Sequence, residues 1–213
     1  MAESKDPCRL CLVTPPGVAP ETFAPILEEA LSGGDVASLI ITAEPAGLAR
    51  LAKALVPIAQ SRGVAALIHN DTQLAGHARA DGVHIDSGFA DLASAISSLR
   101  PDKIVGAGGL RTRHDAMRAG ESDPDYIFFG RLDGDTGPAI FDKALDLARW
   151  WAEIFRIPAI VMGGTSLESV LEARDAGIEF VALSRAVFEH PAGAHAAVTE
   201  ANRLIAEKAE AVP

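Results

Sequence analysis

The stretch that decides the fold is residues 157–184, which reads IPAIVMGGT, then SLESVLEARDA, then GIEFVALS. Two short apolar runs flank an amphipathic segment, with a glycine pair on one side of that segment and a single glycine on the other. Short apolar runs bounded by glycine are typical of buried strands, and an amphipathic segment of this length is typical of a helix. The stretch therefore predicts a strand–helix–strand unit with parallel strands.

The turns that follow these two strands offer backbone N–H groups to a ligand. Gly163 and Gly164 come after the first apolar run, and Leu183, Ser184 and Arg185 lead out of the second. Neighbouring strand–helix turns near the end of a (β/α)₈ chain commonly bind phosphate. We expect these residues to bind phosphate; the alternative for the glycine pair is a tight turn and nothing more, since glycine is the default residue of tight turns.

Apolar runs and amphipathic segments alternate along the whole chain. We expect strands at residues 9–14, 36–41, 64–68, 82–85, 103–107 and 126–129 ahead of the two already described, and helices at residues 21–32, 47–62, 72–78, 89–99, 112–119, 141–155, 166–176 and 195–208. Eight strand–helix pairs close a parallel barrel, whereas doubly wound sheets usually have about five to seven strands. The predicted fold is α/β, a single (β/α)₈ TIM barrel over residues 1–213, with residues 1–8 as an N-terminal tail.

Composition limits the class of protein. The chain has 213 residues, is 48% hydrophobic and carries a formal net charge of −10. It can bury one substantial core, and the negative charge argues against a nucleic-acid partner, whose binding surface should be basic. The first residues lack the apolar region of a signal peptide, and no apolar run is long enough to cross a bilayer. We expect a cytoplasmic protein with no membrane partner.

Two cysteines stand close together near the N-terminus. Cys8 and Cys11 have the C-x-x-C spacing of redox motifs, but the pair runs into the first expected strand instead of opening a helix. No second Cys or His pair lies at zinc-like spacing. We therefore expect both thiols to be buried as small apolar side chains.

In such a barrel the chemistry lies at the C-terminal ends of the strands. Lys103 begins its strand and so belongs to the opposite rim, and no other lysine falls at a C-terminal strand end. This placement argues against a Schiff-base aldolase, whose amine must reach the substrate carbonyl. The residues expected at the C-terminal rim are Thr14, Thr42, His69, Asn70, Asp71, His84, Ile85, Asp86, residues 106–109, Gly130, Arg131, Gly163, Gly164, Ser184 and Arg185.

Two His-x-Asp pairs end neighbouring strands. Asp71, with Asn70 beside it, is the best candidate for a catalytic or metal-binding carboxylate, and equally a candidate for the N-cap of the short helix that follows. A divalent metal could be held jointly by the two pairs, His69 with Asp71 and His84 with Asp86, because imidazole and carboxylate are both suitable ligands for such an ion. The alternative for His84 is a core histidine that is hydrogen-bonded beneath the rim.

Two arginines directly follow strands six and eight. Arg131 and Arg185 could each supply the positive charge that a phosphate needs. For Arg131 the alternative is a surface ion pair with Asp133 or Asp135. Residues 131–138 are rich in glycine, proline, aspartate and threonine, which predicts a mobile loop.

Six short segments, in this order and at this spacing, resemble one known family. They are Asn70-Asp71, Asp81-Gly82-Val83-His84, Ile104-Val105-Gly106, Asp125-Tyr126-Ile127 through Gly130, Met162-Gly163-Gly164 and Ala182-Leu183-Ser184. The family is that of thiamine phosphate synthase and its sister, the thiazole tautomerase. The resemblance runs from Arg9 to Phe188, almost the whole chain.

The resemblance implies an enzyme of thiamine biosynthesis that couples a hydroxymethylpyrimidine diphosphate with a thiazole phosphate and releases pyrophosphate. Asp71 would bind Mg²⁺, with Asp86 as a second carboxylate, and Asn70 would meet the pyrophosphate, with Arg131 as a substitute cation. The phosphate of the thiazole would be held by the amides of Gly163, Gly164, Leu183 and Ser184. The other residues expected to line the pocket are His69, His84, Gly108, Gly130 and Thr136.

Several positions depart from the family pattern. The arginine and lysine of the family at the end of strand two fall on Ile40 and Thr42, and the arginine after the Asn-Asp pair falls on Thr72. Phe89 falls at the position of the second magnesium carboxylate of the family, and Asp86 and Asp91 are candidate substitutes for that carboxylate. Gly108 falls at the position of a family serine, and Leu110 falls at the position of the tautomerase histidine. The Thr-x-Thr-Lys loop is here Gly-Asp-Thr-Gly-Pro around Thr136. The metal and leaving-group half of the site is thus reduced, while the phosphate half remains.

Three functions follow as hypotheses. The first is a thiamine phosphate synthase or a close relative that acts on a small phosphorylated heterocycle. The second is a catalytically degenerate paralogue, tautomerase-like or a binding module, that keeps only the phosphate pocket. The third is a metal-dependent sugar-phosphate epimerase built on the His-x-Asp pairs. Barrels of this size often pair, so a homodimer is a further possibility.

Overall fold

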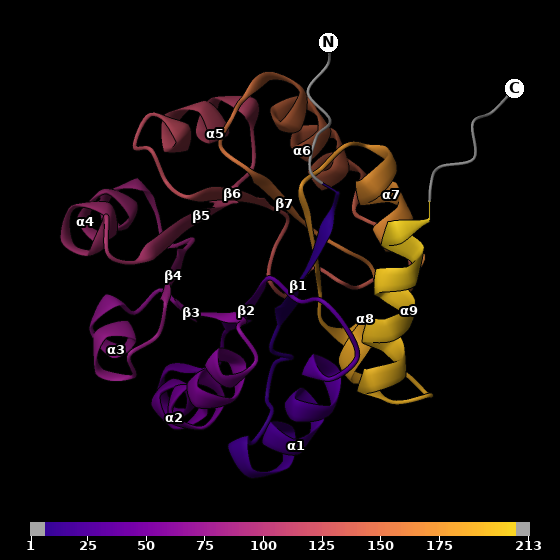
Figure 1. The fold of residues 1–213 in the computed structure, drawn as a ribbon. Helices are drawn as coiled ribbons and strands as arrows, with labels where there is room; N and C mark the ends of the chain where they lie inside the picture. Colours follow the sequence, from indigo (N-terminus) through magenta and orange to yellow (C-terminus); the bar gives the residue numbers. More distant parts are fainter. Residues whose placement is uncertain (1–6, 208–213) are drawn as a thin grey trace, which may run out of the picture.

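The computed structural model describes residues 7–207. Eight parallel strands form a closed barrel in chain order, and β1 pairs with β8 to complete the ring (Figure 1). The strands are β1 Arg9–Val13, β2 Ser38–Ile41, β3 Ala65–His69, β4 Gly82–Ile85, β5 Ile104–Leu110, β6 Tyr126–Phe129, β7 Ala159–Met162 and β8 Phe180–Leu183. The predicted (β/α)₈ TIM barrel is confirmed.

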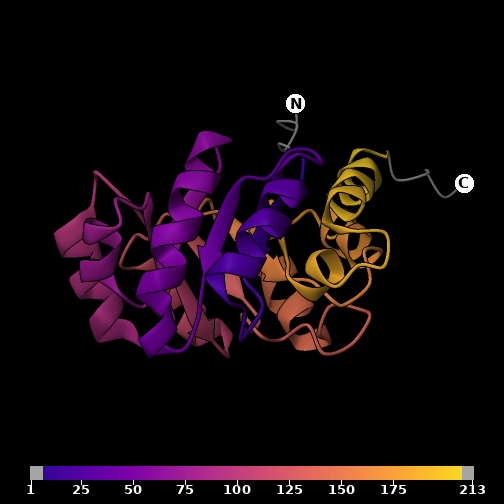
Figure 2. The ribbon, with the colours of Figure 1, turned by 90° about the horizontal axis from the view of Figure 1, so that it is seen from below.

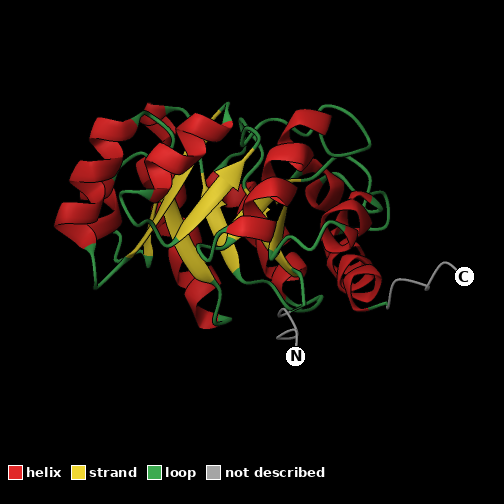
Figure 3. Ribbon diagram, turned by 90° about the horizontal axis from the view of Figure 1, so that it is seen from above, coloured by secondary structure: helices red, strands yellow, loops and turns green. Residues whose placement is uncertain are grey.

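The helices surround the strands on the outside (Figure 2 and Figure 3). They are α1 Pro20–Leu31, α2 Pro45–Ser61, α3 Thr72–His77, α4 Phe89–Leu99, α5 Arg113–Gly120, α6 Asp142–Ile154, α7 Ser169–Asp175, α8 Arg185–Phe188 and α9 Ala194–Ala206. The prediction of one helix after the last strand is wrong, because the short α8 precedes α9. No helix within residues 7–207 has the length and apolar character needed to cross a membrane.

The first and last strands of the barrel, β1 and β8, pair with each other. Leu12 of β1 lies opposite Leu39 of β2 on one side and opposite Leu183 of β8 on the other. Outside the strands, α9 packs beside α1, and the Thr199 hydroxyl donates to the Gly33 carbonyl over 2.8 Å. Ring closure therefore places the C-terminal ends of all eight strands on one rim.

Side chains of each strand alternate between two cores. On β1, Leu10 and Leu12 pack with the helices, whereas Cys11 and Val13 pack inside the barrel. The core inside the barrel consists of Cys11, Val13, Ile40, Leu67, Tyr126, Phe128, Ile160, Met162 and Ala182. Because strand side chains alternate strictly, the continuous apolar runs of the sequence supply both cores at once.

The two cysteines fall into different cores. Cys8 packs with the helices and Cys11 inside the barrel, and both are free thiols. Burial raises the pKa of Cys8 to about 12 and that of Cys11 to about 11. Both thiols are therefore protonated at neutral pH, as expected for small apolar residues and not for a redox pair.

One strand is longer than its sequence pattern indicates. The expected strand ended at residue 107, but β5 continues through Gly108 and Gly109 to Leu110, which pairs with Phe129 of β6. The register shifts between Ala107 and Leu110, as in a β-bulge. The bulge carries Gly109 with φ of 71°, a value that glycine adopts at no steric cost.

A matched pair of phenylalanines tests the core. Phe129 is 0% exposed and Phe141 is 68% exposed. Phe129→Ala should lower the free energy of unfolding by about 3–5 kcal/mol, because it removes a buried ring and leaves a cavity. Phe141→Ala should change it by no more than about 0.5 kcal/mol. Urea denaturation measures both, and similar losses in the two variants would contradict this packing.

Candidate functional site at the C-terminal rim

A chain of hydrogen bonds joins the ends of the first four strands. Thr14, after β1, fixes the backbone of Thr42, after β2: its hydroxyl accepts from the Thr42 N–H and donates to the Thr42 carbonyl, each over 2.8 Å. The Thr42 hydroxyl lies 3.0 Å from Nδ1 of His69, and Nε2 of His69 lies 2.8 Å from Oδ1 of Asp86. A hydroxyl, an imidazole and a carboxylate thus lie in one line across β2, β3 and β4.

Asn70 fixes the carboxylate end of this line. Its amide donates to Oδ1 of Asp86 over 2.7 Å, and its own oxygen accepts the backbone N–H of Asp86 over 2.9 Å. Asn70 has φ of 54°, a left-handed conformation that asparagine tolerates better than most residues. Strained backbone of this kind persists where the surroundings over-determine it, and here the two bonds to Asp86 do so.

The environment of Asp86 keeps its carboxylate ionised. Partial burial alone would raise the pKa, but hydrogen bonds from His69 and Asn70 outweigh it and lower the pKa of Asp86 to about 2. The side chains of His69 and Asp86 remain 22% and 29% exposed, so both can meet a ligand. The line from Thr42 to Asp86 is therefore a polar, accessible part of the rim.

Asp71 begins the next helix. Its Oδ1 accepts the backbone N–H of Leu74 over 2.8 Å, so Asp71 is the N-cap of α3. Its second carboxylate oxygen has no hydrogen-bond partner among residues 7–207. Mg²⁺ in proteins is usually bound by one or two carboxylates, waters and substrate phosphates, so a half-occupied carboxylate at the rim fits such an ion. The cap and the metal role of Asp71 are compatible.

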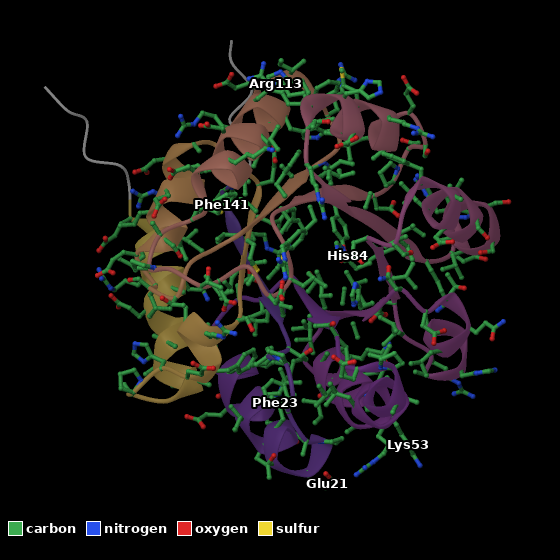
Figure 4. All side chains as sticks on the ribbon, turned by 180° about the vertical axis from the view of Figure 1, so that it is seen from behind. Glu21, Phe23, Lys53, His84, Arg113 and Phe141 are labelled. Atoms are coloured by element: carbon green, nitrogen blue, oxygen red, sulfur yellow. The ribbon has the colours of Figure 1, made fainter. Side chains whose placement is uncertain are left out.

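His84 is a core residue. It is 1% exposed, its Nδ1 lies 2.9 Å from the Tyr126 hydroxyl, and it lies inside the ring of strands (Figure 4). Gly106 makes this pair possible, since a Cβ there would lie 1.9 Å from Cζ of Tyr126. Burial, together with a smaller contribution from nearby His69, lowers the pKa of His84 to about 3, although Asp86 acts in the opposite direction. The imidazole of His84 is therefore neutral, which confirms the core interpretation.

The four-group metal site built from two His-x-Asp pairs is wrong. The part of the chain that the structure describes contains no group of three or more His, Cys, Asp or Glu residues able to hold a metal. His84 bonds to Tyr126, Asp71 caps α3, and of these four side chains only His69 and Asp86 are hydrogen-bonded to each other. This removes the main support for a metal-dependent epimerase.

A small cavity adjoins the polar line. It has a volume of about 150 Å³ and lies between the ends of β4 and β5, where Asp86, Gly108 and Arg111 contribute to its wall. Gly108, expected in the pocket, is half-buried there, and a Cβ on it would lie 2.5 Å from Nε2 of His84. The serine that the resemblance led us to look for at Gly108 would therefore collide with His84.

The expected phosphate corner lies at the ends of β7 and β8, on the same rim. The amides of its glycine pair already have acceptors within the protein. The Gly163 N–H donates to the Ala182 carbonyl over 2.8 Å, and the Gly164 N–H donates to Oγ of Ser169 over 3.0 Å. Leu183 and Ser184 are buried, at 0% and 1% exposure. The glycine pair is thus a packed turn as well as a candidate binding site.

Asp135 was missed as a site residue by the sequence analysis. Its carboxylate is only 2% exposed, and its Oδ2 accepts the backbone N–H of Arg185 over 2.8 Å. Burial raises the pKa of Asp135, partly offset by that N–H and by the charge of Arg185. The only sign in the sequence that Asp135 could belong to the site was its position in the loop after β6, two residues before Gly137. Aspartate in a loop is more often exposed, so this position did not predict a buried carboxylate.

The rest of the loop divides into an exposed part and an anchored part. Arg131 is 79% exposed and bonds both carboxylate oxygens of Asp133, over 2.9 and 2.8 Å, which is the surface pairing considered for it. Thr136 is also exposed. Gly130, at the start of the loop, has φ of 102°, and Leu132 packs against the core inside the barrel. The loop is therefore held to the barrel by contacts of Leu132 and Asp135.

An eight-stranded parallel barrel whose polar residues gather at the C-terminal rim defines the class: a TIM-barrel enzyme with its site formed by the strand–helix loops. The family model for thiamine monophosphate synthase matches residues 10–187, which is most of the chain. The chain belongs to the thiamine monophosphate synthase family.

Curated relatives agree with this assignment. The chain is 36% identical to the thiamine-phosphate synthase of Rhodospirillum centenum, over 93% of this chain and 98% of that protein. It is 33% identical to the thiamine-phosphate synthase of Hyphomonas neptunium, over 95% and 96%. Among solved structures, the thiamine phosphate pyrophosphorylase from Pyrococcus furiosus has a TM-score of 0.74 at 20% identity, over 92% of this chain and 95% of that one, which shows a shared fold.

The buried histidine makes stability depend on pH. The folded pKa of His84 is about 3 against an ordinary value of 6.5, so below pH 6.5 the unfolded chain takes up a proton that the folded protein does not. The contribution of neutral His84 to the free energy of unfolding is therefore fully present above pH 6.5. It is lost as the pH falls towards 3, at up to about 1.4 kcal/mol per pH unit. Urea denaturation between pH 7.5 and 5 measures the slope.

The variant His84→Gln supplies the control for this slope. Glutamine keeps a hydrogen-bonding side chain near Tyr126 but does not titrate. The wild-type protein should lose stability below pH 6.5 more steeply than the variant, by about 1 kcal/mol per pH unit. Parallel curves would show that His84 is not held neutral.

Proposed function

We propose that the protein is a thiamine-phosphate synthase, which couples a hydroxymethylpyrimidine diphosphate with a thiazole phosphate and expels pyrophosphate, in the cytoplasm. One observation carries the proposal: relatives named thiamine-phosphate synthase align with this chain over nearly their whole length, at up to 36% identity. The substrates are then two small phosphorylated heterocycles. The site at the C-terminal rim has two halves that suit them, one at β2–β4 and one at β7–β8.

The half at β2–β4 would face the diphosphate. Expulsion of pyrophosphate needs positive charge or hydrogen-bond donors where negative charge develops, and one such donor is commonly worth about 3–4 kcal/mol. Thr42 stands where the family has a cation, but its hydroxyl lies 3.0 Å from the imidazole of His69. Asp86 accepts a hydrogen bond from the other nitrogen of that ring. The Thr42 hydroxyl and the His69 ring are the polar groups that this strand end would offer to the diphosphate.

Asp71 would hold Mg²⁺ through the carboxylate oxygen that the helix cap leaves unused, and the ion, when bound, would neutralise charge on the diphosphate. Asn70 and Asp86 set the shape of the wall next to it. The half at β7–β8 would hold the thiazole phosphate, with Arg185 as the nearest cation.

A binding role without chemistry is the second candidate. The observation that favours it is the outward position of Arg131, which is paired with Asp133 instead of replacing the missing cations. The two candidates differ in one measurable result. A synthase forms thiamine phosphate from both substrates, whereas a binding module takes up a phosphate ester with an affinity that does not depend on Mg²⁺.

The test uses purified protein, both substrates and Mg²⁺. Wild-type protein should form thiamine phosphate, and Asp71→Asn should reduce the rate by about 10²-fold or more, because it removes the charge that would bind the metal. Asparagine is as good an N-cap as aspartate, so α3 should keep its stability. Chromatography of the product gives the rate, and thermal denaturation checks the fold.

Asp102→Asn is the control for this variant. Asp102 is exposed and precedes β5, on the opposite rim of the barrel, so the same change in charge there should leave the rate unaltered. Wild-type protein that makes no product above background would reject the synthase. Equal rates for wild type and Asp71→Asn would reject the role given to Asp71.

A further inference from the structure

The corner proposed to hold the thiazole phosphate already contains an anion of the protein itself. The Arg185 N–H, at the end of β8, donates to the carboxylate of Asp135 over 2.8 Å. On the neighbouring turn, the Gly164 N–H donates to the Ser169 hydroxyl over 3.0 Å, and Ser169 is 1% exposed. Two side-chain oxygens therefore accept amide hydrogens of this corner, those of Arg185 and Gly164, that would be available to a bound phosphate if these oxygens moved away.

The loop that carries Asp135 spans both turns of this corner. The Thr165 N–H donates to the Gly137 carbonyl over 2.8 Å, and the Ser166 N–H donates to the Pro138 carbonyl over 3.2 Å. Gly164 lies directly beneath: a Cβ there would be 2.1 Å from the Pro138 carbonyl oxygen. The loop is thus bound to the turn after β7 by backbone contacts and to the turn after β8 by the Asp135 carboxylate.

Burying the Asp135 carboxylate at this corner costs free energy, which suggests that the residue has a function there. The side chain is nearly completely buried, and burying a charge is unfavourable unless partners compensate for it. The charged groups near Asp135 are Arg185, whose Nη1 donates to the Asp135 carbonyl over 3.3 Å, and Glu189, which repels it. Burial raises the pKa of Asp135 in spite of the Arg185 charge. The carboxylate is therefore only partly compensated.

We propose that Asp135 sets the affinity and specificity of this corner: its carboxylate occupies the place of the substrate phosphate in the free protein and must leave before the phosphate binds. The inference rests on the proposed function, because it takes the corner to be the phosphate site of that reaction. A phosphate brings more charge and more acceptor oxygens than a carboxylate, so it can replace Asp135 at the Arg185 amide. Ligands with a neutral hydroxyl in place of the phosphate cannot displace it.

The experiment compares two loop variants that each lose one negative charge. Asp135→Asn removes the buried charge but keeps an oxygen that can accept the Arg185 N–H, and Asp133→Asn removes an exposed charge of the same loop. Titration calorimetry measures binding of inorganic sulfate and of the thiazole phosphate, without the pyrimidine substrate. Asp135→Asn should bind both at least about tenfold more tightly than wild type, because repulsion between close charges is strong at a buried site. Asp133→Asn should differ from wild type by less than about threefold, since exposed charges are screened.

A measurement on the unaltered protein covers the case in which Asp135→Asn does not fold. Hydrogen exchange of residues 131–138 should become faster when sulfate saturates the wild-type protein, because Asp135 then loses its bond to Arg185. Unchanged exchange with sulfate bound would overturn the proposal. So would equal affinities in wild type and Asp135→Asn, the same gain in Asp133→Asn, or no binding of sulfate and thiazole phosphate to any variant.

These outcomes are separate from those that test the synthase. The anion measurements need no turnover, so a protein that forms no thiamine phosphate can still show tighter anion binding in Asp135→Asn. Conversely, an active synthase with equal affinities in both proteins would retain the proposed function and reject the role of Asp135.

Discussion

The parallel pairing of β1 with β8 is the constraint on which the rest of the structure depends. It turns a row of strand–helix units into a ring, so that residues far apart in the sequence, such as Thr14 and Arg185, belong to one rim. It also fixes which side chains point inward, because strand side chains alternate. The interior is then filled mainly by apolar residues, with His84, Tyr126 and Ser38 among them, and the accessible polar groups of the proposed site lie at the strand ends. Both halves of the proposed site are a consequence of this closure.

Much of this could be predicted from sequence, because the signals were local or periodic. The bounds of β4, α4 and β6 agree with their apolar runs, and the cap at Asp71 follows from residue type and position. Fold class followed from counting repeats, which needs no knowledge of contacts. The position of His84 beneath the rim was one of two interpretations, and the choice between them depended on Tyr126, forty-two residues away. Such a partner is visible only once the ring has been closed.

The misses are features that local periodicity does not report: contacts between distant parts of the chain and one very short helix. The bulge in β5 depends on the partner strand β6, and α8 is too short to show helical periodicity. The line from Thr42 to Asp86 joins three strands through side chains whose pairing no spacing rule contains. Asp135 contacts an amide fifty residues away, and a loop rich in aspartate and glycine gives no sign that one of its carboxylates is buried. Periodicity reports which elements form, and it does not report which loops meet.

The charge of the chain gives these contacts their functional meaning. A protein with a net charge of −10 does not attract anionic substrates as a whole, so discrimination has to come from groups within a few ångströms of the ligand. On the proposed diphosphate side, Thr42 takes the position of a permanently charged side chain of the family, and its hydroxyl lies beside the imidazole of His69. On the proposed phosphate side, the Asp135 carboxylate would compete with the ligand. Under the proposed function, both features would lower the affinity for free anions, and an enzyme gains nothing from ground-state binding alone once its substrates saturate it. The two halves of the rim are thus consistent with a site that favours complete substrates over the inorganic anions that resemble their charged ends.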